Sequence, residues 1–87
     1  MIITAELSFY PLTEHYKEHV IDLVRDLRKH PDIRIRTGGM STTLEGEYVR
    51  VFDIIRDVTR IHMQRDHGCI LVAKYLNQSA LDNPTID

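Results

Sequence analysis

This sequence of 87 residues has little of several features that mark well-known protein classes. It has one cysteine, Cys69, and no tryptophan. A single cysteine excludes an internal disulfide framework and a zinc site built from several thiolates. No apolar run reaches the roughly 18–20 residues that a membrane span needs. The first residues have neither the basic stretch nor the long apolar stretch of a signal peptide, so we expect a cytoplasmic protein.

The chain also lacks an excess of positive charge. Its 11 Lys and Arg residues against 13 Asp and Glu residues give a net charge of −2. A sequence-independent nucleic-acid binder needs a basic face to neutralise phosphates, so we expect no nucleic-acid partner. With 43% hydrophobic and 28% charged residues, the composition is that of a globular domain. A chain this short buries only about 60–65% of its unfolded surface, so association with a second copy would help its stability.

Hydrophobic patterning predicts six elements in the order βαββαβ. Period-two alternation predicts strands over 3–9, 32–37 and 40–45, and β-prone apolar residues predict a fourth over 69–76. Apolar spacing of three and four predicts amphipathic helices starting near Tyr16 and Tyr48, the second ending before Gly68. We expect Thr13 to cap the first helix, and Gly38-Gly39 to form a tight hairpin turn with positive φ.

This order of elements is typical of the α+β, ferredoxin-like fold. In that fold both helices cover one face of a four-stranded antiparallel sheet, whose first and third strands are central. We expect a single domain over residues 1–78 and a polar C-terminal tail over 79–87.

The alternation along the strands separates two faces of the expected sheet. The face toward the helices is predicted to hold Ile3, Ala5, Leu7, Phe9, Met40 and Leu44. The open face is predicted to hold Thr4, Glu6, Ser8, Tyr10, Ser41, Thr43 and Glu45. Hydroxyls and carboxylates together can recognise an amine or aminopyrimidine edge, provided that a second subunit covers the face. The alternative is that these are ordinary solvent-facing residues of a half-buried sheet.

The histidines and the cysteine do not predict a catalytic or metal site. His15 and His19 are four residues apart on a helix, but no third ligand accompanies them, so we expect a solvated helix face. His62 falls on the apolar stripe of the second helix, where a buried, hydrogen-bonded side chain is expected. Cys69 begins the fourth strand and is expected to be a small core residue.

Three segments taken together carry a family resemblance. Ser8-Phe9-Tyr10-Pro11-Leu12-Thr13 closes the first strand, Met40-Ser41-Thr42-Thr43-Leu44-Glu45-Gly46 forms the third, and Val51-Phe52-Asp53 follows in the second helix. In this order and spacing they resemble the YkoF-like family that binds thiamine and hydroxymethylpyrimidine, within the ferredoxin-like thiamine-binding superfamily. The resemblance covers residues 3–76.

The resemblance implies a cytoplasmic protein that binds thiamine or its hydroxymethylpyrimidine moiety without catalysis, in thiamine salvage or transport. It implies no cofactor beyond this ligand. YkoF-type chains often carry two such repeats, so one repeat implies a homodimer or a tetramer. By position, the implied ligand-binding residues are Ser8, Tyr10, Thr37, Ser41, Thr42 and Thr43. The family has acidic residues where this chain has Gly38 and Gly39, and Glu6 or Glu45 of the open face can substitute for them.

Other functions stay open on the sequence alone. A small dimeric ferredoxin-like enzyme, of the monooxygenase or isomerase type, needs a histidine on the open face, and none of the five histidines lies on a predicted strand. An RNA-recognition domain needs exposed aromatic residues on the central strands and a basic surface, and both are lacking. A purely structural or regulatory dimer uses the same polar-rimmed face, so the sequence does not separate it from a ligand-binding dimer.

Overall fold

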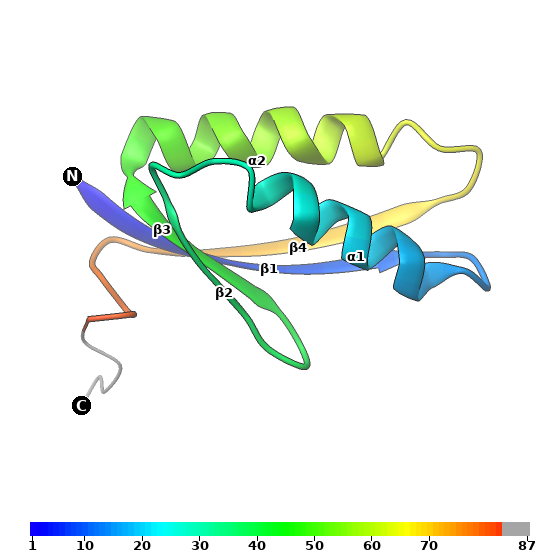
Figure 1. The fold of residues 1–87 in the computed structure, drawn as a ribbon, viewed down its shortest axis with the longest axis horizontal. Helices are drawn as coiled ribbons and strands as arrows, with labels where there is room; N and C mark the ends of the chain where they lie inside the picture. Colours follow the sequence, from blue (N-terminus) through cyan, green and yellow to red (C-terminus); the bar gives the residue numbers. More distant parts are fainter. Residues whose placement is uncertain (83–87) are drawn as a thin grey trace.

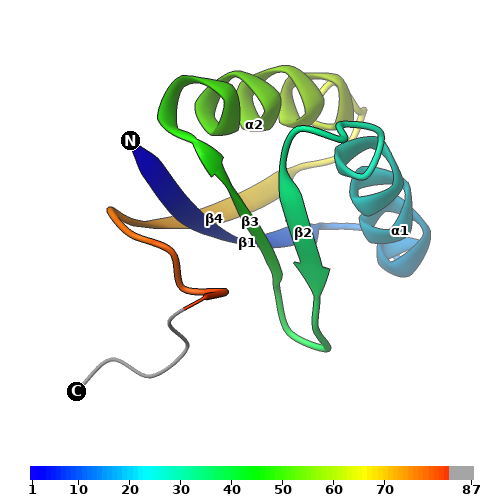
Figure 2. The ribbon, with the colours of Figure 1, turned by 60° about the vertical axis from the view of Figure 1, so that its left-hand side comes forward.

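The computed structural model describes residues 1–82, which form the six predicted elements in the predicted order (Figure 1). They are β1 (Ile2–Pro11), α1 (Tyr16–Leu27), β2 (Arg34–Thr37), β3 (Thr42–Glu47), α2 (Tyr48–His62) and β4 (Cys69–Leu76). The strands lie in one sheet with the order β2-β3-β1-β4, and all neighbours are antiparallel. Both helices cover the same face of this sheet (Figure 2). The ferredoxin-like prediction is confirmed, including the central positions of the first and third strands.

The core lies between the sheet and the helices. Alternate residues of β1 are buried there, and Ala5 lies opposite Leu44 of β3 in the register. The helices contribute Leu23, Leu27, Val51, Ile54, Ile55 and Val58. Period-two burial on the strands and period-3.6 burial on the helices therefore meet in one apolar layer.

The prediction for Met40 is wrong, because its side chain is 92% exposed. The hairpin between β2 and β3 has a four-residue loop, 38–41, which the Gly38 amide closes by donating to the Ser41 carbonyl at 2.9 Å. Met40 thus lies in the loop, and β3 begins only at Thr42. No glycine in residues 1–82 has a positive φ, so the predicted positive-φ turn at Gly38-Gly39 is also wrong. The longer loop reverses the chain without that conformation.

The two helices begin in different ways. Glu47 caps α2, because its carboxylate accepts hydrogen bonds from the amides of Val49 and Arg50 at 2.9 and 3.2 Å. The N-cap of α1 is His15, with no side-chain cap bond, so the predicted cap at Thr13 is wrong. Thr13 lies two residues earlier, in the turn that leads from β1 into the helix.

His62 is buried and hydrogen-bonded, as the sequence predicts, and its partner lies on the other helix. His62 of α2 is 4% exposed, and its Nε2 contacts the carboxylate of Asp26 on α1. The Asp26 carboxylate also accepts from Lys29 at 2.8 Å. These hydrogen bonds, first from Lys29 and then from His62, hold the pKa of Asp26 below its ordinary value.

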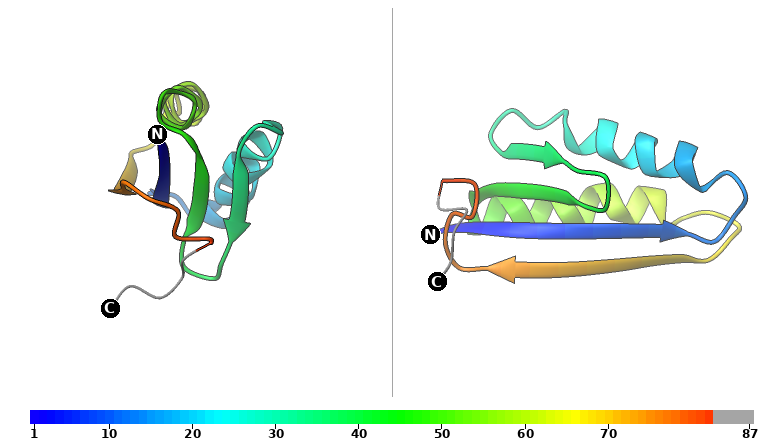
Figure 3. Two further views of the ribbon diagram at one scale, coloured as in Figure 1. Left: turned by 90° about the vertical axis from the view of Figure 1, so that its left-hand side faces the viewer. Right: turned by 90° about the horizontal axis from the view of Figure 1, so that it is seen from below.

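Residues 77–82 turn back from β4 onto the open face of the sheet (Figure 3). The Thr4 hydroxyl donates to the Gln78 carbonyl at 2.8 Å and accepts from the Ala80 amide at 2.9 Å. The described part of the predicted tail is therefore hydrogen-bonded to β1. The rest of that tail, 83–87, lies outside the described residues.

Candidate functional site

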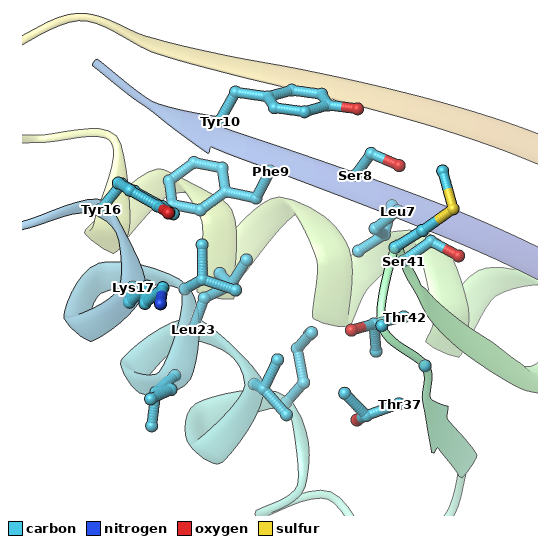
Figure 4. A pocket seen from close by; sticks show the side chains of 17 residues that line it. Leu7, Ser8, Phe9, Tyr10, Tyr16, Lys17, Leu23, Thr37, Ser41 and Thr42 are labelled. Atoms are coloured by element: carbon cyan, nitrogen blue, oxygen red, sulfur yellow. The ribbon is translucent and has the colours of Figure 1, made fainter. Parts of the chain in front are cut away.

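A cleft with a cavity volume of about 480 Å³ lies beside the second half of β1. β1 pairs with β3 only as far as Leu7, opposite Thr42, but it pairs with β4 as far as Pro11. Beyond Leu7 one edge of β1 therefore has no neighbouring strand. α1 and the 38–41 loop form the other walls, so that the cleft opens where β3 is too short (Figure 4).

The lining of the cleft is mostly apolar, with a few hydroxyl groups. The inner wall of α1 contributes Val20, Leu23, Val24 and Leu27. Aromatic rings come from Phe9 and Tyr10 of β1 and from Tyr16 of α1 (Figure 4). A concave apolar site with a small number of polar groups is the usual form of a small-molecule pocket.

The cleft brings together most of the residues that the resemblance implies. They are Ser8, Tyr10, Thr37, Ser41 and Thr42. Within residues 1–82 the hydroxyls of Ser8 and Tyr10 have no protein hydrogen-bond partner, so both can serve a ligand. The Thr37 hydroxyl accepts from Arg28 at 2.8 Å. Thr37 and Thr42 pair in register and share the helix-facing side of the sheet, which explains why they line a cleft beside α1.

Glu6 and Thr43 lie elsewhere, around a smaller hollow of about 200 Å³ on the open face. Thr4, Lys74 and Ala80 are among its other lining residues. The Glu6 carboxylate accepts from the Ser41 hydroxyl at 3.0 Å and lies 3.8 Å from the Lys74 ammonium. Ser41 thus lines the cleft and also contacts the second hollow.

Glu45 faces the open side as predicted, but it is 3% exposed beneath the tail. Its carboxylate accepts from Arg34 at 2.7 Å and from the Leu81 amide at 3.3 Å, and it lies 3.0 Å from the Thr4 hydroxyl, whose one proton it shares with the Gln78 carbonyl. Burial raises the pKa of Glu45, but hydrogen bonds from Ser79, Thr4 and the Leu81 amide outweigh it, so the pKa lies below its ordinary value. Protein groups already occupy both oxygens of this carboxylate.

Two parts of the site were not predicted from the sequence. The apolar stripe of α1 was identified as core, but Val20 and Val24 are only half-buried because they also form the wall of the cleft. The tail was expected to be a loop, and its contacts with Thr4 and Glu45 connect residues far apart in the sequence. No local pattern marks either feature.

The described residues hold neither a cluster of metal ligands nor a membrane-spanning helix. Within residues 1–82 no group of three or more His, Cys, Asp or Glu side chains is arranged to hold a metal ion. His19 and His67 are ring neighbours, with centroids 4.8 Å apart, and the Cys69 sulfur lies 3.7 Å from His67 Nδ1. In the same part of the chain no helix is long and apolar enough to cross a membrane.

Comparison with protein families identifies the family to which this chain belongs. The model of the thiamine-binding protein family matches residues 5–75, which include β1 and the cleft. The chain belongs to the thiamine-binding protein family. The match reaches through most of β4 and confirms the resemblance seen in the sequence. No curated protein matches the chain significantly.

Solved structures of other proteins share this fold. A Streptococcus pneumoniae protein is 17% identical with a TM-score of 0.85, and the match covers 97% of each chain. A Thermotoga maritima protein, described as a candidate thiamine biosynthesis/salvage protein, is 18% identical with a TM-score of 0.78, over 90% of this chain and 85% of that one. A Bacillus cereus domain of unknown function is 21% identical with a TM-score of 0.73, over 90% and 77%. At these identities the likeness shows the fold alone.

Proposed function

We propose that this protein binds thiamine or its hydroxymethylpyrimidine moiety in the cleft beside β1, without catalysing a reaction. The observation that carries the proposal is a mostly apolar cleft of about 480 Å³, whose lining includes the hydroxyls of Ser8 and Tyr10 without a protein partner in residues 1–82, in a chain of the thiamine-binding protein family. Pockets for small molecules commonly measure about 300–1,000 Å³. The proposal includes a role in thiamine salvage or transport in the cytoplasm.

The lining suits a flat aminopyrimidine ring. Aromatic side chains on β1 and α1, Tyr10 and Tyr16, can stack on such a ring or contact its edge (Figure 4). The Ser8 hydroxyl can donate to a ring nitrogen or accept from an exocyclic amino group, and the Ser41 hydroxyl, which donates its proton to Glu6, can accept from the amino group. We therefore assign ligand binding to Ser8, Tyr10, Thr37 and Ser41, with Glu6 reached through the Ser41 hydroxyl.

Titration calorimetry with hydroxymethylpyrimidine and with thiamine tests the proposal. Tyr10→Ala and Ser8→Ala should each weaken binding, Tyr10→Ala by about tenfold because it removes a ring contact. Tyr10 is exposed, Ser8 is half-buried, and neither hydroxyl has a protein partner in residues 1–82, so thermal melts should show that both variants are folded. Thr43→Ala is the matched control, because it removes a hydroxyl from the second hollow and should leave affinity unchanged.

Two results would contradict this assignment. Weaker binding by Thr43→Ala and Glu6→Gln alone would move the ligand to the open face. No binding of either compound to the native protein would exclude the proposed function itself.

The proposal also includes a homodimer that forms through the open face. Tyr10 and Ser8 pair in register with Ile70 and Val72 of β4, so these side chains share that face. Tyr10, Ile70 and Val72 are 51%, 50% and 44% exposed. Neighbouring exposed apolar residues commonly mark an interaction surface. Light scattering after size exclusion should give the mass of two or four chains, and Val72→Lys should give one; a monomeric native protein would exclude the homodimer.

A further inference from the structure

The charge around the cleft is one-sided. Among its lining residues in the described part of the chain, Lys17 of α1 is charged, and none is Asp or Glu. Lys17 is exposed and lies at the α1 end of the cleft, beside Tyr16 (Figure 4). The ammonium can therefore reach a ligand group at the mouth of the cleft while the apolar walls hold the rest of that ligand.

The cations around the cleft are not neutralised within residues 1–82. None of the ion pairs in this part of the chain includes Lys17. Arg28, near the other end of the cleft, donates to the uncharged hydroxyl of Thr37. The Glu6 carboxylate contacts the cleft-lining Ser41, and it already accepts from the Ser41 hydroxyl and lies 3.8 Å from the Lys74 ammonium.

This balance favours some forms of the ligand over others. Thiamine carries a permanent positive charge on its thiazolium ring, whereas a phosphate ester carries close to two negative charges at neutral pH. A cation gains no carboxylate partner among the residues that line this cleft, because Glu6 is reached only through Ser41, whereas a phosphate gains the Lys17 ammonium, which has no ion pair in residues 1–82. Opposite charges attract more strongly beside a low-dielectric wall than in bulk water.

We propose that the cleft is selective for phosphorylated pyrimidines, and that Lys17 is the residue that binds the phosphate. This inference rests on the proposed function, since it assumes that the pyrimidine lies in the cleft. It assigns to Lys17 a role in specificity that the motif positions of the sequence did not include.

Calorimetry with four compounds tests the inference: hydroxymethylpyrimidine, its monophosphate, thiamine and thiamine monophosphate. Each phosphate ester should bind about five- to tenfold more tightly than its parent alcohol, the range for a charge-assisted contact at an exposed site. The preference should shrink when salt is raised from 50 to 300 mM, because salt screens exposed charges.

Lys17→Gln should remove the preference for the esters and leave the affinity for both parent alcohols unchanged. Lys74→Gln is the matched control, because Lys74 is another exposed lysine but lines the second hollow. It should keep the preference. Both side chains are exposed, so thermal melts should show that both variants are folded.

The outcomes separate this inference from the proposed function. Equal or weaker binding of the esters by the native protein would overturn the inference alone, and so would a preference that survives in Lys17→Gln. If none of the four compounds binds, the proposed function fails and the inference fails with it.

Discussion

The two ends of β1 are both lined by polar side chains, but they differ in what those side chains contact. At the first end, Thr4 and its neighbour Glu45 are buried, and both are hydrogen-bonded to the returning tail. At the second end, the hydroxyls of Ser8 and Tyr10 have no protein partner within residues 1–82, and a cleft lies beside them. One strand thus carries a polar cluster satisfied by the protein and one left for another molecule.

This difference shows how a structural polar cluster can be told from a binding site. Buried polar groups need partners, and where the protein supplies all of them the cluster contributes to stability. Where hydroxyls at the edge of an apolar hollow lack protein partners, water or a ligand must supply them. By this criterion Glu45 contributes to the fold, and Ser8 and Tyr10 to recognition. The following predictions test this division.

The largest expected effect is on stability, from Glu45→Gln. The amide removes the charge that pairs with Arg34 and turns one acceptor into a donor beside the Thr4 hydroxyl and the Leu81 amide. We expect the free energy of unfolding to fall by about 2 kcal/mol. For a domain of this size the melting temperature should fall by about 8–16 °C. Affinity for the pyrimidine ligand should not change.

Glu6→Gln is the control for this prediction. Glu6 lies on the same face, but its side chain is 44% exposed and its ion pair with Lys74 is long, at 3.8 Å. Its effect on the melting temperature should be small. A similar fall of the melting temperature in both variants would mean that the hydrogen bonds between Glu45 and the tail do not add to stability.

Acid should reduce the stability that Glu45 contributes at the first end of β1. The folded-state pKa of Glu45 lies below its ordinary value of 4.5, so the unfolded chain binds a proton more readily. The stabilisation is therefore complete above the ordinary pKa and is lost as the pH falls through the folded pKa. The pKa of Asp26 is also lowered, from an ordinary value of 3.8. Protonation of Asp26 below that pH should therefore reduce the free energy of unfolding further. Urea unfolding between pH 7 and pH 3 should show stability falling below about pH 5.

In Glu45→Gln this acid dependence should be weaker, because one of the carboxylates with a lowered pKa is absent. The remaining slope should come mainly from the lower pH range, where Asp26, Asp32, Asp57 and Asp82, whose pKa values are also lowered, titrate. Parallel curves for the native protein and the variant would contradict the hydrogen bonds assigned to Glu45.

The fold could be predicted from the sequence because its causes are local. Alternation along β1 and the apolar stripe of α2 each fix which side of the element is buried. A βαββαβ order then leaves few arrangements, and the central positions of β1 and β3 follow from it. The wrong predictions concern the segments that connect the strands and helices. Nothing local indicated that the hairpin loop extends over 38–41, or that Met40 is exposed within it.

The candidate site was only partly predictable, because it depends on where strands stop pairing. Alternation placed Ser8 and Glu45 on the same face, and their register in the sheet agrees. It could not show that β3 begins only at Thr42, opposite Leu7, which creates the cleft, or that the tail covers Glu45. Both facts depend on contacts between distant segments, so they follow only from the assembled fold.

The smallest expected effect on stability comes from a substitution in the 38–41 loop, which borders the cleft. A Cβ atom added at Gly39 meets nothing within 4 Å, and this residue does not have a positive φ. Gly39→Ala should therefore raise the free energy of unfolding by about 0.5 kcal/mol, because it restricts the unfolded chain more than the folded one. The melting temperature should rise by about 2–4 °C.

Gly46→Ala is the contrasting variant, since its Cβ would lie 2.9 Å from Ile33 Cγ2 in the core and should destabilise the protein. If Gly39→Ala leaves pyrimidine affinity intact, the loop acts only as a passive wall of the cleft. If it weakens binding without loss of stability, the loop must change conformation when the ligand enters. The hydroxyls of the cleft would then not all be preformed for the ligand, whereas the partners of Glu45 are in place before any ligand arrives.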